Sequence, residues 1–168
     1  MKSIILVLAI FVMVFIGCKN QQELSLEKMR GMYALDKFEM LNTQTGEWSP
    51  EISRNGYSGY ILYDGLGHMG VHITPKGYKD FDVRKKIDSA DNQELKALAT
   101  FYQSNFVYFG DYDIKDSVIN HKRLSTADPG EWGTTLTRNV EFRGDTLILT
   151  PHEKISGMQL RLRWVRLK

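Results

Sequence analysis

Short segments in which apolar and polar residues alternate recur from residue 31 to the end of the chain. Alternation with a period of two is typical of β-strands, whose successive side chains point to opposite faces. The Asp64-Gly65-Leu66-Gly67 sequence separates two such segments, and its glycines supply the positive φ that a tight hairpin needs. The pattern predicts about eight antiparallel strands, at residues 31–41, 56–64, 67–73, 104–114, 118–125, 133–142, 145–150 and 157–168, with a loop over residues 42–50.

One segment has helical rather than strand periodicity. Asp91 and Glu94 have the spacing of a capping box, in which each side chain binds a backbone N–H group of the first turn. Leu95, Leu98 and Tyr102 follow at helical spacing and form one apolar face. The sequence therefore predicts a single helix at about residues 89–103.

Eight up-and-down strands leave two exposed edges unless the sheet closes on itself. We therefore predict an all-β fold, an eight-stranded antiparallel up-and-down barrel. The helix is expected to pack against it, across the outside or over one end. A barrel of this size is either filled by its own side chains or holds one small ligand.

The chain begins MKSIILVLAIFVMVFIGC. Lys2 precedes an uncharged apolar run from Ile4 to Ile16, which is shorter than the about 20 residues of a transmembrane helix and typical of a signal peptide. The run ends in Phe-Ile-Gly-Cys, which resembles the lipobox of bacterial lipoproteins. The resemblance implies that residues 1–17 are a signal peptide, cleaved after Gly17, and that Cys18 carries a lipid anchor.

Residues 18–30 are polar after the cysteine and are expected to form a tether with one helical turn at its end, followed by the folded domain at residues 31–168. The predicted partner of Cys18 is a lipid bilayer of the bacterial cell envelope. Lys19 stands where an Asp often signals retention at the inner membrane, so the outer membrane is favoured, at its periplasmic or surface face. A plain secretory signal or an uncleaved anchor are the alternatives.

Composition and motifs exclude several classes of function. The net charge of +2, without a long basic stripe, argues against a nucleic-acid partner. Cys18 is the only cysteine, so the chain forms no intramolecular disulfide, and an acylated Cys18 could not be a nucleophile. The sequence contains no Gly-x-Ser-x-Gly, P-loop or His-Glu-x-x-His motif, so we expect no metal or cofactor and favour a protein without enzymatic activity.

Several segments together resemble the bacterial lipocalin-like domain family. They are GYILYDGLGHMGVHI, VYFGDYDI, VINHKRLS, the block from GEWGTTLTRNVEF through RGDTLILTP, and LRWVR. The resemblance covers Gly31 to Lys168 and implies a barrel with a cavity, without implying a reaction. The family usually opens with Gly-x-Trp, whereas this chain has Tyr33, which could form a cation–π contact with an Arg of the last strand.

His68 and His72 lie four residues apart in the GYILYDGLGHMGVHI segment. On a helix they would share one face and could share a metal. On a strand they would be separated by roughly 13 Å, which is too far for joint ligands. Because the turn glycines and the alternation favour a strand, we expect two structural histidines.

Arg138 lies on the predicted strand face that also carries Leu136 and Val140. A buried arginine needs an anionic or hydrogen-bonding partner. The functional hypothesis gives Arg138 a ligand oxygen in a cavity. The structural hypothesis gives it an internal acid, such as Asp111 or Glu141, or places it in solvent.

His121 lies in a strand where the resembling family tends to carry a histidine. A hydrogen-bonded or exposed strand histidine is the simpler interpretation. The alternative is a catalytic acid or base of a cyclase or isomerase, which predicts a buried His121 with a carboxylate partner, such as Asp111, beside an open pocket.

Six aromatic residues crowd residues 101–112, which indicates a barrel core or a ligand-binding wall. The favoured function is a membrane-anchored lipoprotein that binds a small hydrophobic or amphipathic ligand in a barrel cavity. The predicted ligand-binding residues are Tyr60, Tyr108, His121, Arg138 and Trp164. Besides the enzyme, a structural or interaction protein with a filled barrel is possible, and it predicts an exposed apolar patch and no cavity of ligand size.

Overall fold

The computed structural model describes residues 24–50, 56–80, 89–154 and 157–168. The predicted signal peptide, Cys18 and the first part of the predicted tether lie outside these residues and stay predictions.

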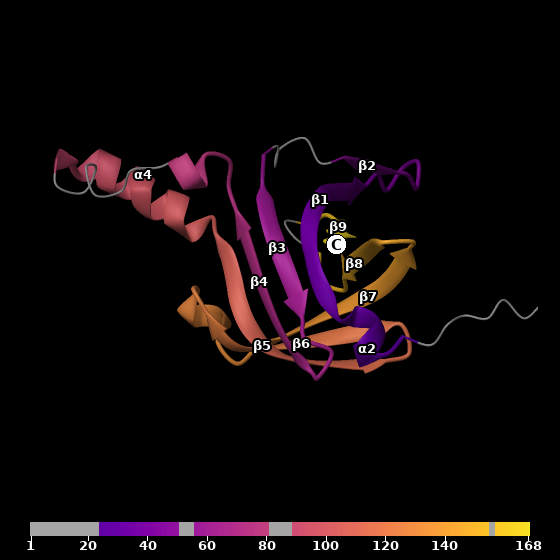
Figure 1. The fold of residues 1–168 in the computed structure, drawn as a ribbon. Helices are drawn as coiled ribbons and strands as arrows, with labels where there is room; N and C mark the ends of the chain where they lie inside the picture. The colour runs from indigo at the N-terminus through magenta and orange to yellow at the C-terminus, as the bar shows by residue number, and fades with distance from the viewer. Residues whose placement is uncertain (1–23, 51–55, 81–88, 155–156) are drawn as a thin grey trace, which may run out of the picture.

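Eight antiparallel strands close into a barrel (Figure 1). Neighbours in the barrel are consecutive along the chain, and β1 pairs with β9 to close the ring, from Tyr33 opposite Arg166 to Met40 opposite Leu160. This confirms the predicted fold class. The barrel strands are β1 (Gly31–Leu41), β3 (Ser58–Tyr63), β4 (His68–Thr74), β5 (Phe106–Lys115), β6 (Val118–Thr126), β7 (Thr135–Arg143), β8 (Thr146–Pro151) and β9 (Leu160–Arg166).

A short additional strand, β2 (Trp48–Pro50), pairs with the end of β1 in the segment predicted as a loop. Three residues are too few to show a period of two, which is why the sequence did not reveal it. Because β2 pairs only with β1, it extends the sheet beside the ring and does not widen the barrel.

The hairpin between β3 and β4 forms where the glycines predict it. Gly65 and Gly67 have φ values of 80° and 111°, which glycine adopts without steric cost. The carboxylate of Asp64 accepts hydrogen bonds from the backbone N–H groups of Leu66 and His68, at 2.7 Å and 3.0 Å. The turn sequence thus fixes the register of this hairpin.

Alternation decides which side chains enter the barrel. On β3, Ile61 and Tyr63 are buried, whereas Tyr60 and Leu62 between them are 51% and 49% exposed. The core combines inward-facing residues of every barrel strand with Met29. Its buried members are Met29, Tyr33, Ile61, Tyr63, Met69, Val71, Ile73, Tyr108, Tyr112, Ile119, Leu147, Leu149 and Trp164.

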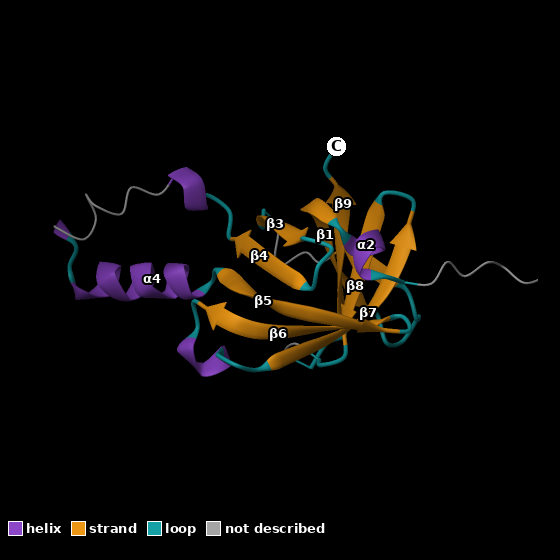
Figure 2. Cartoon of the chain, turned by 60° about the horizontal axis from the view of Figure 1, so that its bottom comes forward, coloured by secondary structure: helices purple, strands orange, loops and turns teal. Residues whose placement is uncertain are grey.

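A helical turn, α2 (Leu26–Met29), closes one end of the barrel (Figure 2). Met29 is fully buried, and its carbonyl oxygen accepts a hydrogen bond of 2.9 Å from the Tyr33 hydroxyl. The guanidinium of Arg166 lies 4.7 Å from the centre of the Tyr33 ring and donates to the Tyr33 hydroxyl. The predicted cation–π contact is therefore present. Residues 26–29 carry the helical turn expected at the end of the tether, but they belong to the barrel.

The helix α4 (Asn92–Gln103) begins at the predicted capping box. The carboxylate of Asp91 accepts hydrogen bonds from the N–H groups of Gln93 and Glu94, and the Glu94 carboxylate accepts one from the N–H group of Asp91. These bonds satisfy backbone donors that have no partner within the helix.

Two views show α4 beyond one end of the barrel, which it meets through its C-terminal turn (Figures 1 and 2). Leu98 is buried, but Leu95 and Tyr102 of the predicted apolar face are 40% and 38% exposed. Phe101 stacks on Tyr78 of the short helix η1 (Tyr78–Asp80), with ring centres 5.8 Å apart. Within the described residues, no helix combines the length and apolar character needed to cross a bilayer.

Candidate functional site: a cavity inside the barrel

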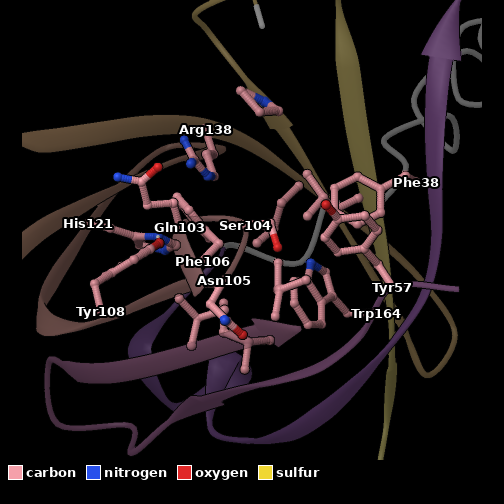
Figure 3. Close-up of a pocket in the computed structure, with 16 residues that line it drawn as sticks. Phe38, Tyr57, Gln103, Ser104, Asn105, Phe106, Tyr108, His121, Arg138 and Trp164 are labelled. Atoms are coloured by element: carbon pink, nitrogen blue, oxygen red, sulfur yellow. The ribbon is translucent and has the colours of Figure 1, made fainter. Parts of the chain in front are cut away.

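A cavity of about 500 Å³ lies inside the barrel, next to the C-terminal end of α4 (Figure 3). All eight barrel strands contribute side chains to its wall, together with Tyr57 and the residues that join α4 to β5. Its volume falls within the range of about 300–1,000 Å³ of small-molecule sites. The lining residues are Phe38, Tyr57, Ile61, Val71, Ile73, Gln103, Ser104, Asn105, Phe106, Tyr108, His121, Arg138, Leu149, Pro151, Leu162 and Trp164.

Three hydrogen-bonded residues, Tyr63, His121 and Tyr108, form a layer between this cavity and the part of the core at the end of the barrel that α2 closes. Nε2 of His121 lies 2.9 Å from the Tyr63 hydroxyl, and Nδ1 lies 2.8 Å from the Tyr108 hydroxyl. Tyr108 and His121 line the cavity, whereas Tyr63 packs edge-on against Tyr33 and Tyr112 behind them. All three members of the layer are almost completely buried.

Burial keeps the members of the layer uncharged at neutral pH. Burial, together with the nearby positive charge of Arg138, lowers the pKa of His121 to about 3. Burial raises the pKa of Tyr108 to about 12 and that of Tyr63 well above its usual range. His121 is therefore a neutral imidazole with both nitrogens bound to hydroxyl groups.

This arrangement differs from the one that acid–base catalysis by His121 requires. The hydrogen-bond partners of His121 among the described residues are tyrosines and not a carboxylate. Asp111 is wrong as its partner, because Tyr112, which is opposite His121 in the β5–β6 register, faces inward. Its neighbour Asp111 therefore points to the outer face, where it lies opposite His68 in the β4–β5 register.

Arg138 lies on the cavity wall, as the functional hypothesis requires, and it also has an acidic partner. Its side chain is 8% exposed, and one guanidinium nitrogen lies 3.2 Å from a carboxylate oxygen of Glu153. The suggested partners Asp111 and Glu141 are wrong. Glu141 alternates to the outer face of β7, where it pairs with Arg143.

Two buried polar atoms beside the cavity have no hydrogen-bond partner among the described residues. They are the indole nitrogen of Trp164 and the side-chain oxygen of Asn105. Figure 3 shows Trp164 across the cavity from Tyr108 and His121. A buried polar group without a partner costs about 1–3 kcal/mol, so each is a place where a bound molecule would gain a hydrogen bond.

Tyr60 does not line the cavity, which corrects its predicted position in the wall. The β3 register turns Ile61 inward, so Tyr60 points outward and is 51% exposed. It borders an apolar outer groove of about 310 Å³, together with Leu62 and Phe109. An exposed apolar patch therefore coexists with the cavity.

His68 and His72 lie on strand β4, as predicted, and both are exposed. Nδ1 of His68 lies 2.6 Å from the Asp64 carboxylate, and the His72 ring contacts Tyr78. In the described ranges, no three His, Cys, Asp or Glu side chains form a group that could hold a metal ion.

Sequence reasoning found Tyr108, His121, Arg138 and Trp164 as cavity residues, but it missed Tyr63 and Glu153. Tyr63 could have been placed inside the barrel from its alternation with Tyr60 and Leu62. Glu153 follows β8 in the sequence, and no periodic pattern indicates that it reaches Arg138.

A family model described as a lipocalin-like domain matches residues 30–165. The match runs from the residue before β1 to the last residue but one of β9, so it includes all eight barrel strands. No curated protein and no solved structure matches the chain.

Proposed function

The chain belongs to the lipocalin-like domain family, and from this premise we propose that it binds a small hydrophobic or amphipathic ligand in the barrel cavity. The observation that carries the proposal is the cavity itself, a space of about 500 Å³ with an apolar and aromatic wall. A filled barrel would instead use its interior side chains to occupy this space.

The contacts of His121 favour a binding protein over an enzyme that uses this residue. A catalytic acid or base works best with a pKa near the working pH and with access to the substrate proton. The pKa of His121 is lowered to about 3, and both ring nitrogens are engaged. We therefore assign His121 to the wall of the site, where it orients Tyr108.

Filling the cavity should weaken ligand binding. Ile61→Trp places a large side chain inside the cavity, and Leu62→Trp places the same side chain outside on the next residue of β3. We expect Ile61→Trp to weaken binding of the apolar fluorophore N-phenyl-1-naphthylamine by about tenfold or more, a loss of about 1.4 kcal/mol. The measurement is a fluorescence titration.

Leu62→Trp should bind the fluorophore as the wild type does. Urea unfolding of both variants separates a filled cavity from a misfolded barrel. Equal affinity of a folded Ile61→Trp variant and the wild type would contradict a ligand site in the barrel.

We further propose that the protein is a lipoprotein held at a bilayer of the bacterial cell envelope, most simply the outer membrane. The lipobox-like sequence before Cys18 supports this proposal. Five residues lie between Cys18 and Leu24, and six fully extended steps span about 20 Å, so a chain anchored at Cys18 holds the closed end within about that distance of the bilayer. The cavity wall at the end of α4 lies at the other end of the barrel from α2 and would face away from the bilayer (Figure 1).

Replacing Cys18 should release the protein from the membrane. Radiolabelled palmitate should be incorporated into the wild type and not into Cys18→Ser, because the chain has no other cysteine. We expect the variant to leave the membrane fraction, since each acyl methylene contributes about 0.8 kcal/mol to anchoring. Wild-type protein that incorporates no radiolabelled palmitate would contradict the lipid anchor at Cys18.

A further inference from the structure

The burial of Tyr63 determines which group donates and which accepts in each hydrogen bond of the buried layer. The Tyr63 hydroxyl is fully buried, and its only hydrogen-bond partner among the described residues is Nε2 of His121. If Nε2 carried the proton, the Tyr63 hydrogen would be buried without an acceptor, at a cost of about 1–3 kcal/mol. Tyr63 therefore donates to Nε2, and the proton of the neutral imidazole lies on Nδ1.

This tautomer determines what Tyr108 offers to the cavity. Nδ1–H of His121 donates to the Tyr108 oxygen, so the Tyr108 hydrogen cannot point at His121. Tyr108 lines the cavity, and its hydroxyl hydrogen has no acceptor among the described residues. An oxygen that accepts a hydrogen bond also becomes a better donor. The layer thus presents an O–H donor to the cavity.

Trp164 adds a second donor to the wall. Its indole N–H can only donate, it is buried, and it lacks a partner among the described residues. The side-chain oxygen of Asn105, at the junction of α4 and β5, supplies an acceptor. The inner wall therefore suits a ligand with acceptor oxygens, and Asn105 suits a hydroxyl or N–H group elsewhere on it.

The charges around the cavity do not favour a ligand with a net charge. Glu153 neutralises Arg138, and Glu131 forms an ion pair with Arg123, the other buried arginine on this side of the barrel. Among the described lining residues, none supplies a cation without an acidic partner. A ligand carboxylate would lose its hydration and meet the negative charge of Glu153.

Resting on the proposed binding function, we propose that the ligand is a neutral hydrophobe with a carbonyl oxygen, and that Tyr108 recognises this oxygen through its free O–H group. A ketone, ester or amide carbonyl accepts this bond without carrying a charge into the barrel. The aromatic rings of Phe38, Tyr57, Phe106 and Trp164 supply flat apolar surface for the rest of the molecule.

Three naphthalene derivatives of similar size test the proposal on the wild-type protein. They are 2-acetylnaphthalene with a neutral carbonyl, 2-ethylnaphthalene without an acceptor, and 2-naphthoate with a carboxylate. Displacement of N-phenyl-1-naphthylamine gives their affinities. We expect the ketone to bind about tenfold more tightly than the ethyl compound, the effect of one buried hydrogen bond, and more tightly than the carboxylate.

Tyr108→Phe should reduce the affinity of the ketone to that of the ethyl compound and leave the ethyl compound unchanged. The matched control is Tyr60→Phe, which removes a tyrosine hydroxyl from the outer face of the barrel and should keep the preference for the ketone. Circular dichroism checks that both variants fold. If Tyr108→Phe does not fold, the comparison of the three naphthalene derivatives on the wild-type protein still tests the proposal.

The outcomes separate this inference from the proposed function. Tightest binding of 2-naphthoate, or equal binding of the ketone and the ethyl compound, would overturn the carbonyl assignment and leave a ligand-binding barrel. Binding of N-phenyl-1-naphthylamine without displacement by any of the three would also overturn it. If the fluorophore itself does not bind, the proposed function fails.

Discussion

Lowering the pH from 7 to 3 should remove roughly 4 kcal/mol of stability through His121 alone. The imidazole has its ordinary pKa near 6.5 in the unfolded chain, whereas burial lowers its pKa to about 3 in the folded barrel. Below pH 6.5 the unfolded state binds a proton that the folded state does not bind. The stabilisation by this residue is therefore complete above pH 6.5 and is lost progressively as the pH falls towards 3.

Urea unfolding at pH 6.5, about 5.8 and about 5.0 measures this loss above the ordinary pKa values of carboxylates. His121→Phe should be less stable than the wild type at pH 6.5, because two buried tyrosine hydroxyls lose their partner. Its stability should nevertheless fall less steeply with acidification. A His121→Phe variant with the slope of the wild type would contradict the buried neutral imidazole.

His68→Gln is the matched control for this experiment. His68 is exposed, and its hydrogen bond to Asp64 raises its pKa. A raised pKa has the opposite sign, so its contribution is present at low pH and is lost as the pH rises. His68→Gln should therefore not flatten the loss of stability on acidification.

Gly110→Ala should destabilise the barrel by about 3 kcal/mol or more. Gly110 faces inward on β5, beside a β-bulge in its pairing with β6. A Cβ atom at this position would overlap the backbone carbonyl oxygen of Lys122 and crowd the Cα atom of Arg123 at 3.2 Å. Because these are backbone atoms, β5 and β6 would have to separate. Urea unfolding measures the effect.

The control is Gly130→Ala, in which the new Cβ meets only the Asp128 side chain, at 3.4 Å. Neither glycine has a positive φ, so the comparison isolates the steric clash from backbone preference. We expect Gly130→Ala to change stability by less than about 0.5 kcal/mol. Equal effects of the two substitutions would show that β6 moves to accommodate the extra atom.

Local patterns carried most of the fold prediction. Alternation located the eight strands to within a few residues, and the capping box at Asp91 and Glu94 marked the start of α4. Alternation did not reveal the hydrogen-bond and ion-pair partners of the buried polar residues in the cavity wall. His121 meets Tyr63 and Tyr108 from two other strands, 58 and 13 residues away in the sequence. Glu153 reaches Arg138 from the segment after β8.

The strand content, the turns, the helix start and the antiparallel order could be predicted from the sequence, because each depends on neighbours within a few residues. It also supplied the candidates Tyr108, His121, Arg138 and Trp164. The packing of the strands was needed to show that Tyr60 faces outward, that Glu153 neutralises Arg138, and that His121 joins two tyrosines. These features depend on register and barrel closure, since a shift of one residue turns every side chain of a strand to the opposite face.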